Sequence, residues 1–440
     1  MKPINVGLLG IGTVGGGTWA VLARNREEIS RRAGRDIRIS VVADKEVDKA
    51  KKLVAGSARV TADAFEVVRD PEIDIVIELI GGYGVAKELV LAAIGNGKHV
   101  VTANKALLAT HGNEIFAAAQ KKGVMVAFEG AVAGGIPIIK ALREGLTANR
   151  IEWIAGIING TSNFILSEMR DKGLAFDAVL KEAQRLGYAE TDPTFDIEGV
   201  DAGHKLTIMS AIAFGIPMQF DKCYKEGISK LTQADIRYAE QLGYRIKLLG
   251  ITKRSRVGNE DGIELRVHPT LIPAKRLIAN VEGVMNAVLV KGDAVGPTMY
   301  YGAGAGAEPT GSAVVADLVD VTRLHTADPE QRVPHLAFQP DRMSNLKILP
   351  MEEVVTAYYL RMQVEDRPGV LADISRILAD AAISINAMVQ REPAKGEKQV
   401  DIIMLTHQTR EKSINTAIGK IEKLPVVTGK VTRIRLEELQ

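Results

Sequence analysis

The sequence predicts an α/β protein with a doubly wound parallel sheet at its N-terminus, an α+β middle region and a small β-α-β-β-α-β unit at its C-terminus. Residues 1–130 alternate short apolar runs with helical patterns. Residues 136–300 mix long amphipathic segments with β-like runs. Residues 353–440 alternate between strand and helix periods in the ferredoxin-like order. The length of 440 residues is sufficient for several domains, each with its own core.

Composition narrows the functional classes. The charged fraction is 25% and the formal net charge is +2, so no global field favours nucleic acid or an anionic membrane. Cys223 is the single cysteine, which excludes an intrachain disulfide framework and fits a reducing, cytoplasmic setting. Glycines interrupt the apolar run MKPINVGLLG, and no stretch approaches the ~18 uninterrupted apolar residues of a membrane span. We therefore expect neither nucleic acid nor a membrane as a partner.

The N-terminal elements read as buried parallel strands separated by helices, because the strand candidates are continuously apolar. A first helix is expected through Trp19 to Arg31. The expected strands are 4–10, 38–44, 73–82, 98–104 and 124–130, and the later helices are 85–95 and 106–121.

The middle region combines helical segments with β-like runs, and it ends in a glycine-rich loop that leads into an apolar helix at 302–324. We expect this helix to pack back on the first region. Residues 326–350 carry four prolines and little periodicity, which indicates a linker. The expected helices are 162–172, 174–186 and 200–214, and the expected strands are 150–160, 244–252 and 263–269.

The C-terminal region predicts six elements. The expected strands are 357–366, 383–392, 398–407 and 428–436, and the expected helices are 369–381 and 413–424. The predicted domains are 1–135 together with 302–325, 136–301 and 353–440, with 326–352 as the linker.

A glycine motif follows the first strand. Gly10, Gly12 and Gly15 form GxGxxG between a strand and a helix, the context in which this motif binds the pyrophosphate of a dinucleotide. Asp44 ends the second strand, where an acid would bind the ribose hydroxyls of NAD. The adjacent Lys45 would instead suit the 2′-phosphate of NADP, so the choice of cofactor stays open.

An acidic run, GYAETDPTFDIEGVDAGHK, spans residues 187–205. Asp201 and Lys205 are four residues apart on an expected helix, hence on one face. The pair is either a surface salt bridge or a lysine that takes a hydroxyl proton while a carboxylate holds it. An amino-acid substrate would also need carboxylates for its ammonium group. Thr102 and Lys105 lie at the carboxyl end of an expected strand, where ligands bind in such sheets.

Four segments carry a resemblance: GIGTVGGG, TANKALLATHG, FEGAVAGGIPIIKAL and the run from Ala183 to Lys205. On these segments the chain resembles homoserine dehydrogenase of the long, bacterial, monofunctional type over essentially its full length. The stretch DRPGVLADIS resembles an ACT regulatory domain.

The resemblance implies NAD(P)-dependent interconversion of L-homoserine and L-aspartate 4-semialdehyde, in the biosynthesis of threonine, methionine and isoleucine. It makes Lys205 the proton donor and acceptor, and Asp201 its orienting partner. It also makes Lys105 a contact of nicotinamide and substrate, and Glu190 the ligand of the substrate ammonium, with Asp196 near it.

The resemblance implies further ligand contacts. The implied cofactor contacts are Thr13, Val14, Gly304 and Gly306. The implied monovalent-cation site, for Na⁺ or K⁺, consists of Glu129, Val132, Gly134 and Ile136. The implied contacts of a feedback ligand, L-threonine, are Gly369, Val370 and Asn386. A homodimer or homotetramer is expected, because ACT units usually pair through their sheets, which would add to a dimer formed by the middle domain, 136–301.

The sequence leaves two other functions to distinguish from this one. An acylating semialdehyde dehydrogenase needs an activated cysteine nucleophile, and Cys223 has no glycine-rich nucleophile turn around it. A non-catalytic NAD(P)-sensing regulator would not need two lysines and several carboxylates together, and turnover would distinguish it from an enzyme. Asp192, Glu198 and His204 are expected to be structural.

Overall fold

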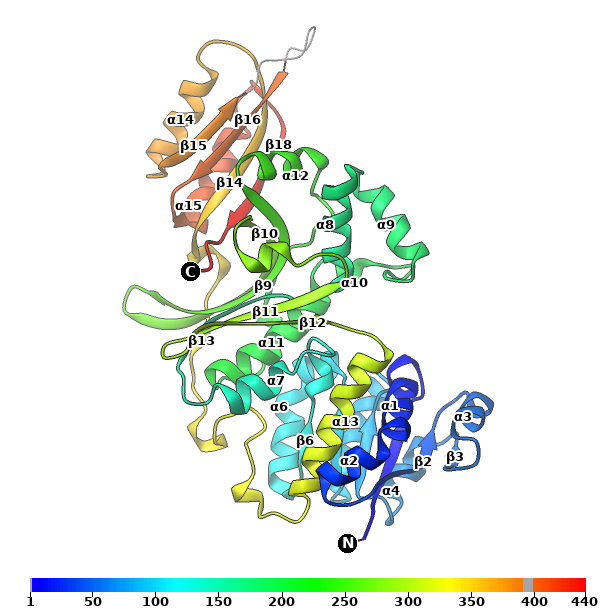
Figure 1. The fold of residues 1–440 in the computed structure, drawn as a ribbon. Helices are drawn as coiled ribbons and strands as arrows, with labels where there is room; N and C mark the ends of the chain where they lie inside the picture. The colour runs from blue at the N-terminus through cyan, green and yellow to red at the C-terminus, as the bar shows by residue number, and fades with distance from the viewer. Residues whose placement is uncertain (1, 391–398) are drawn as a thin grey trace. The chain divides into compact units, whose positions relative to one another are not determined.

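The computed structural model describes residues 2–390 and 399–440. The chain divides into two compact units that interleave along the sequence (Figure 1). Unit 1 comprises Met1–Gly160, Asp201–Cys223 and Val284–Leu346, and unit 2 comprises Thr161–Val200, Tyr224–Gly283 and Lys347–Gln440.

Unit 1 contains a parallel sheet in the order β3-β2-β1-β4-β5-β6. This order confirms the predicted doubly wound fold, with its switch point between β1 and β4. The strands are β1 Ile4–Leu9, β2 Ile37–Ala43, β3 Arg59–Thr61, β4 Ile75–Glu78, β5 His99–Thr102 and β6 Val126–Ala127.

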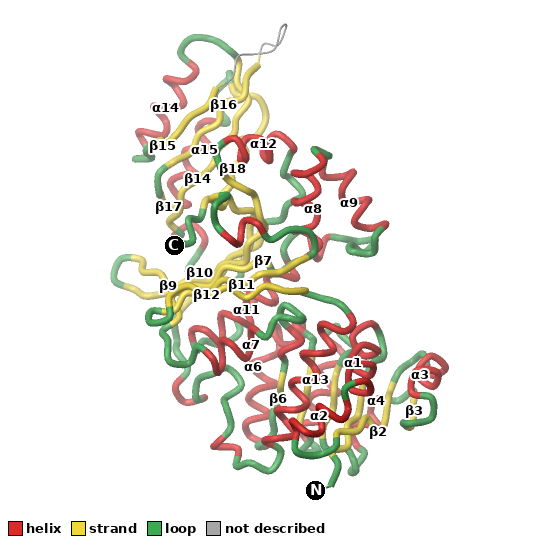
Figure 2. Tube along the Cα trace, in the orientation of Figure 1, coloured by secondary structure: helices red, strands yellow, loops and turns green. Residues whose placement is uncertain are grey.

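Helices flank these strands, as the red and yellow segments of Figure 2 show. The helices are α1 Thr13–Arg24, α2 Arg26–Ala33, α3 Val47–Val54, α4 Ala64–Arg69, α5 Gly84–Gly95, α6 Lys105–Lys122 and α13 Ala307–Leu324. Gly17 of α1 lies against α13 so closely that a Cβ on it would stand 2.0 Å from the carbonyl oxygen of Ala307. The glycine therefore permits the close packing of these two helices.

Three expectations for this sheet were wrong in detail. One helix through Trp19 to Arg31 is in fact two, because Asn25 leaves the helical conformation at φ −106° and ψ 18°. The expected strand 73–82 ends at Glu78, whose carboxylate accepts the N–H groups of Ile80 and Gly81 at 2.9 and 3.0 Å and turns the chain. The expected strand 124–130 gives way to the 3₁₀ turn η1, Glu129–Ala131.

The rest of unit 1 centres on an antiparallel sheet, β12-β11-β7, and on α11, Val200–Phe214. Every residue of α11 from Asp201 to Phe214 is buried, so the helix is a core element rather than an amphipathic one. The remaining elements are α7 Ile138–Lys140, η2 Ala141–Gly145, β7 Ile151–Ile157, η3 Phe220–Lys222, β11 Met285–Gly292, β12 Gly296–Ala303, η5 Pro329–Gln331 and η6 Pro340–Arg342.

Unit 2 contains a sheet in the order β9-β10-β18-β14-β16-β15. Its C-terminal part has the predicted β-α-β-β-α-β order, which confirms the ferredoxin-like fold. Strand β18 pairs in parallel with β10 through Thr270 and Arg435. The parts of the expected strands at 391–392 and 398 lie outside the described residues.

The elements of unit 2 are as follows. The helices are α8 Gly160–Lys172, α9 Phe176–Arg185, α10 Thr194–Ile197, α12 Gln233–Gln241, η4 Leu277–Asn280, η7 Met351–Glu353, α14 Val370–Asp380 and α15 Glu411–Ile421. The strands are β8 Tyr224–Lys225, β9 Tyr244–Val257, β10 Glu260–Pro273, β13 Lys347–Ile348, β14 Val355–Glu365, β15 Ile385–Gln390, β16 Gln399–Thr406, β17 Thr409–Arg410 and β18 Val427–Leu436. Among the described residues, no helix combines the length and apolar character needed to cross a membrane.

Candidate active site

A buried lysine and carboxylate lie at the start of α11 in unit 1. Asp201 and Lys205 are 3% and 7% exposed. The Nζ of Lys205 donates to Oδ2 of Asp201 at 2.7 Å and to the carbonyl oxygen of Ile158 at 2.8 Å. Asn159 donates its Nδ2 to the same Asp201 oxygen at 2.9 Å. The four-residue spacing thus gives a desolvated ion pair rather than a surface salt bridge.

A second lysine reaches the same carboxylate from α6. Lys105 is the first residue of this helix, and the side chain of Asn104 caps it by accepting the N–H of Leu107. The Nζ of Lys105 lies 3.1 Å from Oδ1 of Asp201, and its side chain is 35% exposed. Asp201 therefore binds one lysine through each of its oxygens.

The electrostatics of this centre favour an ionised Asp201. Burial alone would raise the pKa of its carboxyl group, but the charges of Lys205 and Lys105 and the hydrogen bonds from Lys205 and Asn159 outweigh burial and hold the pKa well below its ordinary value. A buried lysine held by an ionised carboxylate suits general acid–base catalysis.

The glycine loop joins β1 to α1 in an unusually close turn. Gly10 has φ +92°, and a Cβ on it would meet the carbonyl oxygen of Leu79 at 2.8 Å. A Cβ on Gly15 would stand 2.1 Å from the carbonyl oxygen of Gly10. Gly12 caps α1, whose first residues are Thr13 and Val14, and apart from its neighbours in the chain no described atom lies within 4 Å of where its Cβ would be. The loop is therefore tight where it packs and open at the helix N-terminus, as a phosphate cradle requires.

Other predicted cofactor residues are engaged within the sheet. The Oδ2 of Asp44 accepts the N–H of Ile11 at 2.7 Å, so this carboxylate also braces the glycine loop. Lys45 is exposed next to it. Thr102 is fully buried and donates its hydroxyl to Oε2 of Glu78 at 2.8 Å.

The segment 129–136 makes a sharp buried turn. Ala133 and Gly134 have consecutive positive φ angles of 54° and 47°. A Cβ on Gly134 would meet the carbonyl oxygen of Gly304 at 2.7 Å. Glu129, Val132 and Ile136 are 3%, 0% and 2% exposed.

The carboxylate of Glu129 faces α7. It accepts the N–H groups of Ile139 and Lys140 at 2.9 and 2.8 Å, while its own N–H donates to Oδ2 of Asp317 at 2.8 Å. Burial raises the pKa of both carboxyl groups, and Glu129 raises that of Asp317 further. In the described part of the chain, no group of three or more His, Cys, Asp or Glu side chains is placed to hold a metal ion. A cation at this turn would need backbone carbonyl ligands.

The acidic run lies in unit 2 up to Val200. Glu190 is exposed and Asp196 is half-buried. The Nε2 of Gln184 donates to the carbonyl oxygens of Glu190 and Thr191 at 3.1 and 3.2 Å and so holds the loop against α9.

The residues expected to be structural have local partners. Asp192 accepts the N–H of Thr194 at 3.1 Å, and Glu198 accepts the hydroxyl of Ser229 at 2.6 Å. The buried ring of His204 packs in a tilted arrangement against the ring of Phe220, with 4.1 Å between the ring centroids, and Cys223 is buried.

The predicted regulatory residues lie on α14 and β15. Gly369 caps α14 with φ +93°. The side chain of Val370 belongs to the ferredoxin-like core. Asn386 is exposed. Gly306, one of the predicted cofactor contacts, caps α13 with φ +127° and is also exposed.

Sequence reasoning missed Asn159 and the carbonyl group of Ile158, which complete the surroundings of Asp201 and Lys205. Asn159 directly precedes α8, and an asparagine at this position indicates an ordinary helix cap. A backbone carbonyl group carries no sequence signal at all.

Comparisons with known proteins agree along the chain. The family model described as "Homoserine dehydrogenase, NAD binding domain" matches residues 10–129, "Homoserine dehydrogenase" matches residues 137–319, and "ACT domain" matches residues 358–426. A homoserine dehydrogenase of Pseudomonas aeruginosa is 64% identical over 439 residues, which cover 100% of both chains.

Solved structures give the same result. The crystal structure of a homoserine dehydrogenase from Thiobacillus denitrificans matches with a TM-score of 0.95 and 73% identity, over 100% of this chain and 99% of that one. A hyperthermophilic archaeal homoserine dehydrogenase in complex with NADPH matches with a TM-score of 0.62 and 26% identity, over 74% of this chain and 99% of that one.

Proposed function

The chain belongs to the homoserine dehydrogenase family of NAD(P)-dependent oxidoreductases, and we propose that it interconverts L-homoserine and L-aspartate 4-semialdehyde with Lys205 as the proton donor and acceptor. The observation that carries the proposal is the buried centre in which Asp201 holds Lys205 and Lys105 at 2.7 and 3.1 Å.

In the oxidation direction, the neutral amine of Lys205 takes the proton of the substrate hydroxyl group as the C–H bond is broken. In the reduction direction, the ammonium group returns that proton to the forming alkoxide. Asp201 orients Nζ of Lys205 and stabilises its charged form. Bound nicotinamide supplies the hydride acceptor or donor.

The fit of the chain to a nicotinamide dinucleotide rests on the glycine loop. Its open face at Gly12 and the N-terminus of α1 suit a pyrophosphate. The residues proposed to hold the cofactor are Gly10, Gly12, Thr13, Val14, Gly15, Asp44, Lys45, Thr102, Lys105, Gly304 and Gly306. Asp44 favours NAD, whereas Lys45 favours NADP, so both cofactors belong in the assay.

The substrate ammonium group is assigned to Glu190, with Asp196 near it. Glu190 is an exposed carboxylate on a loop, and the side chain of Gln184 holds the backbone of this loop. An exposed carboxylate on an anchored loop suits a ligand that must enter and leave. Replacing Glu190 by Gln should raise the KM for L-homoserine and leave the KM for the cofactor unchanged. An unchanged KM for homoserine would remove Glu190 from the site.

A monovalent cation is assigned to the turn made by Glu129, Val132, Gly134 and Ile136. Consecutive positive φ angles turn the backbone sharply at 133–134, and two buried carboxyl groups lie beside the turn. Hard oxygen ligands suit Na⁺ or K⁺. Activity in Na⁺ or K⁺, compared with activity in a tetramethylammonium salt, tests this site, and equal rates would exclude it.

The ACT part, 353–440, is proposed to bind L-threonine near Gly369, Val370 and Asn386 as a feedback ligand. Inhibition by threonine in the same assay tests this, and its absence at millimolar threonine would refute it.

We also propose a cytoplasmic homodimer or homotetramer, in which residues 1–135 and 302–325 bind the cofactor, 136–301 carry catalysis and 326–352 link them to the ACT part. Light scattering measures the oligomer, and a monomer would contradict it.

The deciding experiment measures NADH or NADPH formation with L-homoserine at alkaline pH, for the wild type and Lys205→Met. We expect turnover by the wild type and a loss of about 10²–10⁴ in kcat for the variant, with cofactor binding retained. Lys98→Met is the matched control, since Lys98 is also a buried lysine of unit 1 and its hydrogen bonds within the described residues go to the carbonyl oxygens of Asp70 and Ile73. Equal losses in the two variants would show a folding effect, and an inactive but folded wild type would refute the function.

A further inference from the structure

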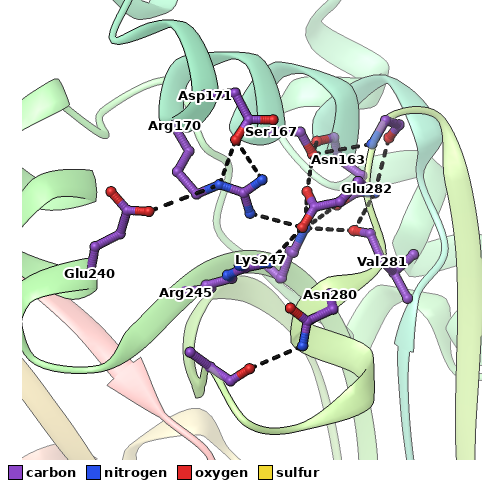
Figure 3. Close-up of polar contacts among 12 residues, drawn as sticks. Asn163, Ser167, Arg170, Asp171, Glu240, Arg245, Lys247, Asn280, Val281 and Glu282 are labelled. Carbon is purple, nitrogen blue, oxygen red and sulfur yellow. Dashed lines mark hydrogen bonds and ion pairs between the residues drawn. The ribbon is translucent and has the colours of Figure 1, made fainter.

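A partly buried charge cluster around Glu282 lies in unit 2 (Figure 3). Three cationic side chains converge on Glu282. Arg170 and Arg245 each place a guanidinium nitrogen 2.8 Å from its Oε1, and Nζ of Lys247 lies 3.3 Å from its Oε2. Burial would raise the pKa of Glu282, but the hydrogen bonds from Arg170 and Ser167 and the charges of Lys247 and Arg170 outweigh burial and lower the pKa to about 2.

Lys247 is not needed to neutralise Glu282, because two arginines already do so. Its shortest hydrogen bonds go elsewhere. Nζ donates to the carbonyl oxygen of Val281 at 2.6 Å and to Oδ1 of Asn163 at 3.1 Å. A lysine that is only 1% exposed carries a large desolvation cost, which lowers its pKa to about 8. The bonds that offset this cost fix Asn163 and the turn at 281–283.

Asn163 ties helix α8 to that turn. Its Nδ2 donates to the carbonyl oxygens of Val281 and Gly283 at 3.1 and 2.9 Å, while its Oδ1 accepts from Lys247. Asn163 is 1% exposed, so water cannot replace these bonds.

The residues on either side of Asn163 hold the acidic loop. The hydroxyl of Thr161 donates to the carbonyl oxygen of Tyr188 at 2.6 Å, and the hydroxyl of Ser162 donates to that of Asp196 at 3.1 Å. The ring of Phe164 packs edge-on against the ring of Tyr188 at 5.0 Å. The start of α8 therefore anchors both ends of the loop that carries Glu190.

We infer that Lys247 is a positioning residue for substrate binding: by fixing Asn163 it sets the place of α8, and α8 in turn sets the loop that carries Glu190 and Asp196. This inference rests on the proposed function, in which that loop holds the substrate ammonium group. Lys247 itself need not touch the substrate.

The test compares Lys247→Met with Arg245→Met by steady-state kinetics. Methionine keeps the apolar stem of Lys247 and removes its three hydrogen bonds. Arg245→Met is the matched control, because it removes a cation from the same Glu282 carboxylate without a bond to Asn163. We expect the KM for L-homoserine to rise about tenfold in the lysine variant only, the size of one lost hydrogen bond to a charged group. The KM for the cofactor should stay within about twofold in both variants.

Two further measurements separate positioning from general destabilisation. Ser162→Ala removes the hydrogen bond from α8 to the carbonyl oxygen of Asp196 and should by itself raise the KM for homoserine. The double variant Ser162→Ala/Lys247→Met should have the same KM as Lys247→Met alone, because both changes act through α8. The single variant Ser162→Ala also tests the inference if the lysine variant does not fold.

The pH profile gives an independent readout. A neutral Lys247 has two N–H groups for three acceptors, so the ratio of homoserine KM between variant and wild type should fall above about pH 8. Of the charged groups that face it, Arg170 and Arg245 keep their charge, and Glu282 stays ionised there.

Three results would overturn the inference: an unchanged homoserine KM in Lys247→Met, an equal rise in Arg245→Met, or a parallel rise in the KM for the cofactor. Each presupposes turnover by the wild type. A wild type without homoserine turnover would instead refute the proposed function, so the two failures are distinguishable.

Discussion

Replacing Asp201 by asparagine tests the central electrostatic argument. The substitution keeps the shape of the side chain and removes its charge, so two lysines lose their counter-charge. Lys105 is 35% exposed and can turn towards water, whereas Lys205 is 9% exposed at its side chain and cannot. The cost therefore comes mainly from one buried, uncompensated ammonium group.

The expected magnitude follows from that burial. Breaking a buried ion pair by removing one partner costs about 3–5 kcal/mol. We expect the lower end, about 3 kcal/mol, because Lys205 keeps its bond to the carbonyl oxygen of Ile158. For a unit of this size, each kcal/mol lowers Tm by about 2–4 °C, which gives a loss of about 6–12 °C. We also expect kcat to fall about 10²-fold, since the lysine loses its orienting partner.

The effect should be independent of pH between about 5 and 8. A carboxylate with a depressed folded pKa stabilises the protein above its unfolded pKa of about 3.9, and this stability is lost as the pH falls through the folded pKa. The pKa of Asp201 is held well below its ordinary value, so the difference between wild type and Asp201→Asn should shrink only below about pH 4.

Thermal unfolding by circular dichroism, at several pH values, is the assay. Asp36→Asn is the matched control, because Asp36 also binds two cations, Arg26 and Arg38, each at 2.6 Å, but at a surface site that is 24% exposed. Water screens that site, so the control should lose less than about 1 kcal/mol. Equal Tm losses in the two variants, or no loss in Asp201→Asn, would refute the reasoning from burial.

Three other predictions concern stability. Burial lowers the pKa of His335 to about 4, so on acidification this histidine is protonated in the unfolded state before it is protonated in the folded state. The free energy of unfolding should therefore fall as the pH drops below about 6.5. Urea titrations at pH 7 and pH 5 measure this fall, and His335→Gln should make it smaller. Gly17→Ala places a Cβ 2.0 Å from a carbonyl oxygen of α13 and should cost about 1–3 kcal/mol in thermal unfolding, whereas Gly16→Ala, whose nearest atom is 3.9 Å away, should be neutral. Arg435→Met removes one of the two arginines that pair with the buried Glu411, which keeps Arg433 at 2.8 Å, and should cost about 1–3 kcal/mol in urea titrations, the size of lost hydrogen bonds to a charged group; a loss below about 0.5 kcal/mol would contradict this.

The sequence predicts the long elements and misses the short ones for a physical reason. The apolar strands β1, β2 and β4 reveal themselves by continuous hydrophobicity, which burial on both faces of the sheet requires. Strand β3 has three residues, of which Arg59 is exposed, so it has no such signature. The break at Asn25 is equally invisible, because both flanking segments favour helix.

Within the candidate site, the sequence predicts contacts along one helix and misses contacts between distant segments. The four-residue spacing of Asp201 and Lys205 places them on one helical face, and their atoms do meet at 2.7 Å. Lys105 reaches Asp201 from another segment, and no local pattern encodes this ion pair. Its place at the end of an expected strand and the family resemblance predicted a ligand contact only. Lys247 lies in an ordinary strand pattern, and its partners are a carbonyl group, an amide group and a carboxylate from distant segments.

The shared carboxylate has a consequence for the proposed reaction. Lys205 must alternate between its neutral and charged forms when it takes and returns a proton. If it were the sole partner of Asp201, each neutral state would leave a buried, unpaired carboxylate, at a cost of several kcal/mol. Lys105, on the other oxygen, keeps Asp201 compensated in both states, and Asn159 holds its hydrogen bond throughout. Oxidation of an alcohol requires Lys205 in its neutral form. The two-lysine arrangement lowers the free-energy cost of this neutral form, whereas a single buried ion pair would raise it.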